Sequence, residues 1–290
     1  MKTYVIDAIL RESKKLKFFI RGIYKGQYPR KELAPKVLKF EQSTFESHKG
    51  TLNCFISWKS TKLTKLHAEQ YLRFIEINTD VQFWFFDDDS QDLWMKENFH
   101  SHPIYRVYKG STFAASKNDI FRLCLLFKYG GVYTSINRCF HIKLKDLYSE
   151  PKRFLISFEK NTYEREYAED IPIEFRKFNV VQHTLFSPPR HKILEIAINR
   201  IVKYAPRYDK VIFKSVKEAI WRFTAPYSLT DAVDEYLTEY GAREVQFCGI
   251  QYNSACFIPA GAEFRYAKSP SYLGGRSRMI LDMDRSDYSN

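Results

Sequence analysis

Apolar and polar residues follow one another in blocks between residues 52 and 99. The segments 52–58 (LNCFISW) and 81–86 (VQFWFF) are short, apolar and bounded by polar residues, which is typical of buried strands. Apolar residues at helical spacing over 62–78 predict a helix between these strands, and a second helix is expected over 90–99. Strands that alternate with helices predict an α/β fold with a mostly parallel sheet.

The segment 115–137 has the strongest local pattern. Ser116 and Asp119 have the spacing of a capping box, which predicts a helix that begins at Ser116. Gly130 fits the left-handed position that ends such a helix, and a short strand is expected over 132–136. One apolar stripe lies between these ends and consists of Ile120, Leu123, Cys124 and Phe127.

Asp119 and Arg122 are three residues apart and should project from the same face of the first helical turn. A helix N-terminus, a carboxylate and a guanidinium at a sheet edge could bind a nucleotide sugar. A helix cap with a local ion pair explains the same spacing equally well, so both interpretations stay open here.

The chain is basic, with 46 Lys and Arg against 34 Asp and Glu and a net charge of +12. Residues 1–36 contain ten basic and three acidic residues and therefore carry +7 of this charge. The pattern over 4–25 predicts a helix, either an ordinary helix with a solvated basic face or one lying on an anionic membrane. A basic excess suits phosphate-bearing partners, but no nucleic-acid-binding signature is present, so nucleic acid is not expected as a partner.

The 290 residues are enough for a sizeable core, and no apolar stretch reaches the roughly 18 residues of a membrane span. The first residues lack the apolar segment of a signal peptide. The five cysteines show no CxxC spacing, which favours a reducing compartment. We therefore expect a cytoplasmic protein.

The sequence resembles a known family around the segment 115–133. Ala115-x-x-x-Asp119-x-x-Arg122, an apolar helix and Tyr129-Gly-Gly-Val-Tyr133 are similar to the core of the DXD-type sugar transferases of the GT-A fold. The resemblance is closest to the group of yeast initiating α-mannosyltransferases and bacterial capsule or lipopolysaccharide transferases, and more distant to the large clostridial glucosylating toxins. Weaker similarities occur in the right order at 56–60 (ISWKS), at Asn179 with 186–191 (FSPPRH), and at 224–230 (TAPYSLT).

The resemblance implies a GT-A-like, mixed but mostly parallel sheet flanked by helices over residues 51–290. Residues 1–50 would form a basic helical extension, and residues 175–290 would shape the acceptor site. The implied activity moves a sugar from a UDP- or GDP-sugar to a hydroxyl of a polysaccharide or glycolipid, with retention of the anomeric configuration.

The resemblance also implies roles for particular residues. Trp58 would stack on the base of the donor, Asp119 would bind sugar or ribose hydroxyls, and Arg122 would pair with the sugar or diphosphate. The other residues expected at the donor are Ser116, Gly131, Tyr133, Ser135, Asn137 and Arg138. The expected catalytic residues are Asp119, Arg122 and Arg138.

The sequence departs from the family at the metal ligands. Family members read Gly-Gly-x-Tyr-x-Asp-x-Asp, and their two aspartates hold Mn²⁺ or Mg²⁺ against the diphosphate, whereas Ser135 and Asn137 stand here. Hard divalent cations prefer anionic oxygen ligands, so Asn137 would be a weak metal ligand at best. Three explanations stay open: a metal-independent transferase that uses Arg138, metal binding by the acidic residues at 87–89 or at Asp282 and Asp284, or an inactive relative that acts as a binding or scaffold protein.

Overall fold

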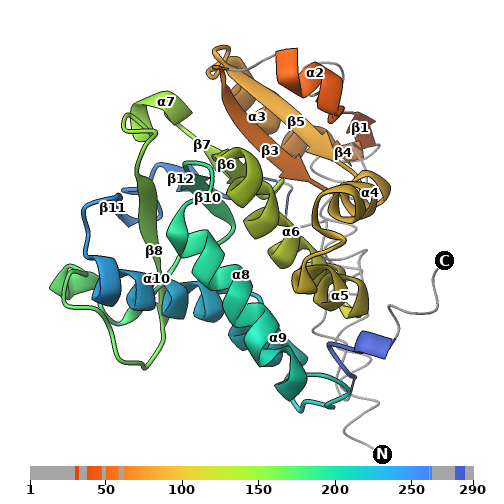
Figure 1. The fold of residues 1–290 in the computed structure, drawn as a ribbon. Helices are drawn as coiled ribbons and strands as arrows, with labels where there is room; N and C mark the ends of the chain where they lie inside the picture. The colour runs from red at the N-terminus through yellow and green to blue at the C-terminus, as the bar shows by residue number, and fades with distance from the viewer. Residues whose placement is uncertain are drawn as a thin grey trace, which may run out of the picture.

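The computed structural model describes residues 30–32, 38–47, 50–58, 62–260, 262 and 278–284 (Figure 1). The helix expected over 4–25 lies outside the described residues. The membrane-surface role expected of residues 1–36 therefore stays a prediction.

The main sheet has the strand order β11-β8-β10-β6-β3-β5-β2, and β9 pairs antiparallel with the last part of β8, between Phe158 and Thr162. The central strands β3, β5 and β6 are parallel, as are β2 with β5 and β11 with β8, whereas β10 is antiparallel to β6 and β8. The expected mixed, mostly parallel sheet is confirmed. Its strands are β2 (Leu38–Lys39), β3 (Leu52–Ser57), β5 (Val81–Phe86), β6 (Gly131–Thr134), β8 (Phe154–Thr162), β9 (Phe178–Val180), β10 (Thr184–Ser187) and β11 (Val245–Ile250).

Two small antiparallel pairs accompany the main sheet. They are β1 (Arg30–Glu32) with β4 (Lys62–Thr64), and β7 (Cys139–Phe140) with β12 (Cys256–Phe257). The described α-helices are α2 (Gln42–Ser47), α3 (Lys65–Glu76), α4 (Asp88–Phe99), α5 (Pro103–Gly110), α6 (Ala114–Tyr129), α7 (Leu144–Leu147), α8 (Lys192–Tyr204), α9 (Val216–Phe223) and α10 (Pro226–Tyr240). Short 3₁₀ turns lie at Ile173–Phe175 and Ala205–Arg207.

Side chains of the sheet pack alternately into two separate hydrophobic cores, because successive residues of a strand point to opposite faces. On one face, residues such as Phe55, Trp84 and Tyr133 pack against α4, α5, α6, α8, α9 and α10. On the other face, residues such as Ile56 and Phe83 pack against α3 and α7. The fold is thus three layers, and Figure 1 shows α6 running beside α5 and α8.

The strands expected over 52–58 and 81–86 are confirmed as β3 and β5. The helix expected over 62–78 begins only at Lys65, because residues 62–64 pair with β1. The helix expected over 90–99 begins at Asp88, because the side chain of Asp87 accepts a hydrogen bond from the Ser90 N–H at 2.9 Å and caps it.

The capping box predicted at Ser116 is wrong. Helix α6 begins at Ala114 after Phe113, which provides no side-chain cap, and the buried Ser116 hydroxyl has no hydrogen-bond partner. The chain just before α6 is held by a distant segment: Thr112 N–H donates to the Ile280 carbonyl. This long-range contact sets where the helix starts. The predicted end is correct, with Gly130 at φ +64°.

Residues 38–47 are part of the main domain, although the sequence placed them in a helical extension. Strand β2 pairs in parallel with β5 at the edge of the main sheet. Phe45 is buried in the same core as Phe55 and Trp84, and the ring of Phe40 stacks on Phe86 at 4.6 Å. In the described part of the chain, no helix is both long enough and apolar enough to cross a bilayer.

Candidate donor and transfer site

A cavity of about 700 Å³ lies at one edge of the main sheet, within the size range of small-molecule sites. The parallel strands β3, β5, β6 and β8 all end at this edge, and the antiparallel β10 begins there. Residues at or near these strand ends line the cavity, among them Trp58, Asp88, Ser135 and His183, together with Glu159 from within β8. Ligands of open α/β sheets bind at this kind of edge.

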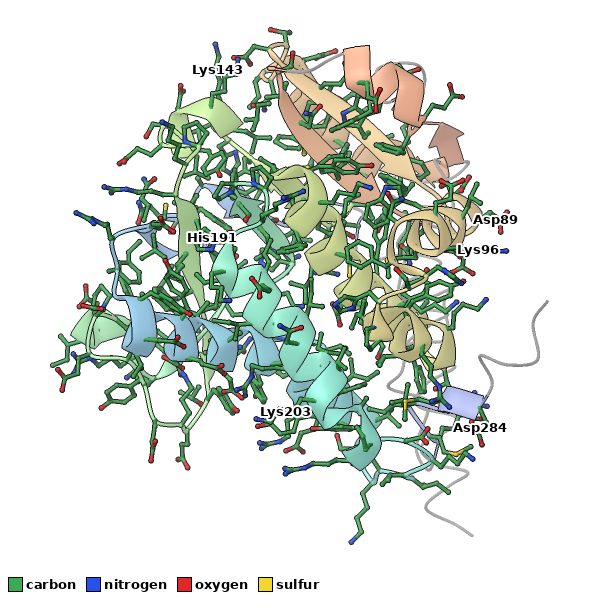
Figure 2. The ribbon with its side chains drawn as sticks, in the orientation of Figure 1. Asp89, Lys96, Lys143, His191, Lys203 and Asp284 are labelled. Atoms are coloured by element: carbon green, nitrogen blue, oxygen red, sulfur yellow. The ribbon has the colours of Figure 1, made fainter. Side chains whose placement is uncertain are left out.

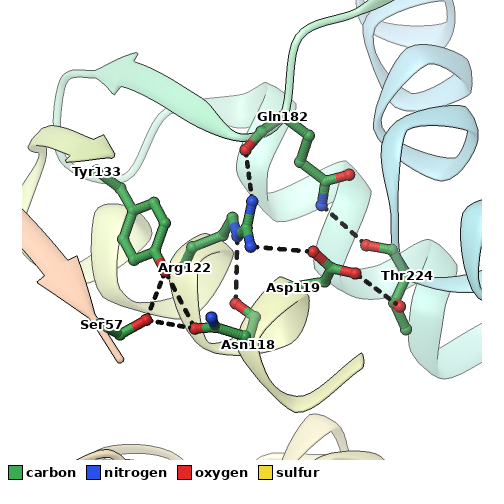
Figure 3. Close-up of polar contacts among 7 residues, drawn as sticks. All are labelled: Ser57, Asn118, Asp119, Arg122, Tyr133, Gln182 and Thr224. Carbon is green, nitrogen blue, oxygen red and sulfur yellow. Dashed lines mark hydrogen bonds and ion pairs between the residues drawn. The ribbon is translucent and has the colours of Figure 1, made fainter. Parts of the chain in front are cut away.

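Helix α6 contributes an ion pair to the cavity wall (Figure 3). The Arg122 guanidinium lies 3.2 Å from the Asp119 carboxylate, and both residues are 8% exposed. The same guanidinium donates to the Asn118 carbonyl at 3.2 Å and to the Gln182 carbonyl at 2.7 Å, and it lies over the Tyr133 ring at 4.9 Å. The prediction that Asp119 and Arg122 share one face of the helix is confirmed.

All three guanidinium nitrogens of Arg122 therefore contact an oxygen of the protein. Two of the five N–H donors of an arginine remain after these contacts. Arg122 joins α6 to the segment before β10 and fixes the orientation of Asp119. The expected direct pairing of Arg122 with sugar or diphosphate stays a prediction.

Burial raises the pKa of Asp119 from 3.8 to about 6, although the Arg122 guanidinium and a hydrogen bond from Thr224 act in the opposite direction. The Thr224 hydroxyl donates to Asp119 Oδ2 at 3.4 Å. The carboxylate is thus mostly ionised at neutral pH, inside a cavity and against one fixed cation. Such a group accepts hydrogen bonds strongly from hydroxyl groups.

Three of the residues expected at the donor do not line the cavity. Tyr133 is buried, and its hydroxyl lies 2.6 Å from Ser57 Oγ and donates to Asn118 Oδ1 at 3.0 Å (Figure 3). Gly131 has φ +92°, and a Cβ there would lie 2.6 Å from the Asn53 carbonyl oxygen. Ser116 is also fully buried behind the cavity wall. These residues support the wall but do not form it.

The turn after β6 presents Ser135, Asn137 and Arg138 to the cavity. It is held by two backbone hydrogen bonds of 2.8 Å, from Ser135 N–H to the His183 carbonyl and from Arg138 N–H to the Ser135 carbonyl. Within the described residues, Arg138 has no carboxylate within 4.0 Å, and its guanidinium donates only to the Asn137 carbonyl at 3.2 Å. Arg138 is therefore the cavity cation best able to pair with an added anion.

His183 beside this turn adds no charge. Burial lowers its pKa well below 6.5, and the nearby Arg138 and Arg122 guanidinium groups lower it further. Its Nε2 lies 3.2 Å from the Gln251 side-chain oxygen and its Nδ1 lies 3.2 Å from Thr184 Oγ1. The imidazole is thus neutral and held in place.

The ligand set does not fit a divalent cation. Ser135 and Asn137 offer only neutral oxygens to the cavity, and no group of three or more His, Cys, Asp or Glu in the described ranges could hold a metal ion. Of the acidic residues at 87–89, Asp87 caps α4 and only Asp88 lines the cavity. Asp284 pairs with Lys210 and lies at the periphery near α5, and neither it nor Asp282 lines the cavity (Figure 2).

Trp58 lies at the end of β3, where its backbone N–H donates to the Phe86 carbonyl at 3.0 Å. The side chain is half-buried and lines the cavity. Two residues that were not expected from the sequence also line it, Glu159 within β8 and Trp221 on α9. Glu159 could have been found, since it directly follows the apolar run 154–158 (FLISF), but no sequence signal singles out Trp221.

Comparison with known families gives one match. Residues 37–152 match the model of the family described as "Glycosyltransferase sugar-binding region containing DXD motif". Every residue expected at the donor, from Trp58 to Arg138, lies in this region. The match supports the expected enzyme class, a glycosyltransferase.

Similar structures were also found. The structure described as "PaToxG Glycosyltransferase" is 13% identical and has a TM-score of 0.40, with coverage of 82% of this chain and 81% of that one. The UDP-bound glycosyltransferase domain of the YGT toxin is 13% identical with a TM-score of 0.33, over 60% of this chain and 56% of that one. Comparison with curated proteins gave no match.

Proposed function

We propose that the chain transfers a sugar from a UDP- or GDP-sugar to a hydroxyl group of a polysaccharide or glycolipid, with retention of the anomeric configuration. One observation carries this proposal: a single cavity collects Trp58, Asp119, Ser135, Asn137 and Arg138 from three separate elements, inside a region that matches a sugar-transferase family. A binding function for small, phosphate-bearing substrates explains why the wall combines an indole, a buried carboxylate and a cation.

The order of strands suggests how the donor lies. Trp58 at the end of β3 would stack on the base, and the turn after the neighbouring β6 would bind the diphosphate. Asp119 would accept hydrogen bonds from hydroxyls of the sugar or ribose, held in position by Arg122. The side chains of Ser135 and Asn137 would donate hydrogen bonds to diphosphate oxygens.

The reaction would need no divalent cation. Negative charge grows on the nucleotide diphosphate as the glycosidic bond breaks, and a preorganised cation stabilises it. Arg138 can supply that charge, since no carboxylate of the described chain lies within ion-pair distance of it. A guanidinium is also able to bind phosphate oxygens through two parallel hydrogen bonds.

Thermal-shift measurements with UDP-glucose and GDP-mannose, in EDTA and in Mn²⁺, test this proposal. A rise in melting temperature in EDTA supports metal-free donor binding, because a ligand that binds only the folded state stabilises it. A rise that requires Mn²⁺ would refute the role of Arg138. No rise with either donor would refute donor binding altogether.

A second candidate function is a binding or scaffold protein with the same fold and no activity. It is favoured by one observation, the neutral Ser135 and Asn137 at the positions of the metal ligands. Donor hydrolysis separates the two candidates: release of free sugar from a bound donor supports the enzyme, whereas binding without release or transfer supports the scaffold.

A further inference from the structure

The strand order places residues of the cavity wall in a row along the sheet edge. Along it come β3 with Trp58, β6 with Ser135, β10 with His183 and finally β8 with Glu159. Three strand spacings separate β3 from β8, which is roughly 14 Å. If the base lies at Trp58 and the diphosphate at the turn after β6, as the proposed function has it, the sugar and its acceptor must meet near Glu159.

At this end of the cavity, the Glu159 carboxylate can accept further hydrogen bonds. The carboxylate accepts from the buried Asn179 side chain at 3.3 Å and from the Asn161 side chain, while the other side-chain atom of the Asn179 amide, Oδ1, has no hydrogen-bond partner. No Lys or Arg of the described chain lies within 4.0 Å of the carboxylate. A carboxylate has about four acceptor positions, so room remains for a ligand hydroxyl.

The electrostatics around Glu159 make it a strong acceptor of hydrogen bonds. Burial raises the pKa of Glu159, whereas hydrogen bonds from Asn179 and Asn161 and the charges of Arg138 and Lys217 act in the opposite direction. The carboxylate therefore gains basicity from burial without a neighbour that neutralises it through a direct ion pair.

Trp221 forms the apolar wall beside Glu159. The indole is half-buried, and its neighbours hold its orientation. The Tyr227 ring meets it edge-on at 5.5 Å and stacks in turn on Tyr163 at 4.1 Å, and Lys217 Nζ lies 4.3 Å from the indole centroid. A fixed aromatic surface beside a carboxylate suits a saccharide, which presents C–H groups and hydroxyls together.

Resting on the proposed function, we propose that Glu159 and Trp221 form the acceptor subsite and that its ligand is a sugar hydroxyl. Trp221 packs against the acceptor ring, and Glu159 accepts a hydrogen bond from an acceptor hydroxyl next to the attacking one. In the transfer, the acceptor oxygen bonds to the anomeric carbon and the bond from that carbon to the diphosphate oxygen breaks. The electron pair leaves with the nucleotide diphosphate. Because retention requires attack from the face that the diphosphate leaves, the hydroxyl proton passes to the departing diphosphate oxygen.

The test compares donor binding with acceptor use in Glu159→Gln and Trp221→Ala. The probes are UDP-glucose and GDP-mannose as donors, and methyl glucosides and methyl mannosides of both anomers as acceptors. We expect Glu159→Gln to lower transfer to the methyl glycosides by about 10- to 100-fold, because a neutral amide replaces a charged hydrogen-bond acceptor, while the donor dissociation constant stays within about twofold. Trp221→Ala should raise the acceptor KM, and Trp221→Phe should recover most of the loss.

Glu164→Gln is the matched control, since Glu164 is exposed on the loop after β8 and lies outside the cavity wall. Glu164→Gln should change neither the transfer to the methyl glycosides nor the donor dissociation constant. Saturation-transfer NMR of the methyl glycosides with nucleotide-loaded protein gives a readout that needs no turnover, and Trp221→Ala should lose this signal.

Undiminished transfer in Glu159→Gln, or an equal loss of donor binding in both variants, would overturn the subsite. So would a wild-type chain that binds a donor but gives no NMR signal with any of the glycosides, and in that case the proposed donor site would stand. Failure of the wild type to bind either donor would instead refute the proposed function and the subsite with it.

Discussion

Asp119→Asn should make the fold more stable at neutral pH while it abolishes donor binding. The carboxylate is 8% exposed, and burial raises its pKa from 3.8 to about 6. An acid with a raised pKa in the folded state costs stability once it is ionised. Asparagine keeps a side-chain oxygen that can accept from Arg122, and it carries no charge to bury.

The magnitude follows from the shift in pKa. Each pKa unit corresponds to 1.36 kcal/mol, so the rise from 3.8 to about 6 costs about 3 kcal/mol at pH 7. Between pH 4 and pH 6 the folded state binds this proton and the unfolded state does not, so stability falls as pH rises through that window. The variant should match the wild type near pH 4 and exceed it by about 3 kcal/mol at pH 7 to 8.

Urea unfolding at pH 4, 5, 6, 7 and 8 measures this difference, and effects of all other titrating groups cancel between the two proteins. Asp170→Asn, at an exposed position, is the control and should change stability by less than about 0.5 kcal/mol at every pH. A variant less stable than the wild type at pH 7, or a difference independent of pH, would refute the reasoning. Stability gained together with binding lost is the signature of a residue kept for function.

Three further predictions concern the turn after β6 and the wall behind it. Arg138→Ala should weaken UDP and GDP binding in EDTA by about 10- to 100-fold, since it removes hydrogen bonds to a charged group, and calorimetry should find no change in the surface control Arg153→Ala. The double variant Ser135→Asp with Asn137→Asp should acquire donor binding that Mn²⁺ tightens at least about tenfold; equal affinity in EDTA and Mn²⁺ would argue against this turn as the diphosphate site. Gly131→Ala should lower the free energy of unfolding by about 2 kcal/mol or more, because its Cβ would meet the Asn53 carbonyl at 2.6 Å, whereas Gly50→Ala, at a similar φ of +93° but with open space around it, should cost less.

Local patterns predicted the centre of the fold well. Strands β3 and β5 are continuous apolar runs with polar ends, and this pattern can be read from the local sequence alone. The start of α6 could not be predicted, because it depends on backbone hydrogen bonds between residues 110–112 and residues 280–282. Contacts across 170 residues leave no periodic signal in the sequence.

The candidate site was predictable only where its residues lie close together in the sequence. Asp119 and Arg122 share a helical turn, so their spacing was enough to predict the ion pair. That Arg122 is held by the Gln182 carbonyl depends on the antiparallel β10, whose place beside β6 no local pattern indicates. Trp221 reaches the cavity only through the packing of α9 beyond the sheet.

A crystal structure of the chain with UDP-glucose or GDP-mannose, grown in EDTA, tests the central claim most directly. We predict that the diphosphate lies within hydrogen-bond distance of Arg138, that the base lies against Trp58, and that the sugar points toward Asp119 and Glu159. A nucleotide bound outside this cavity, or with its diphosphate away from the turn at residues 135–138, would contradict the account.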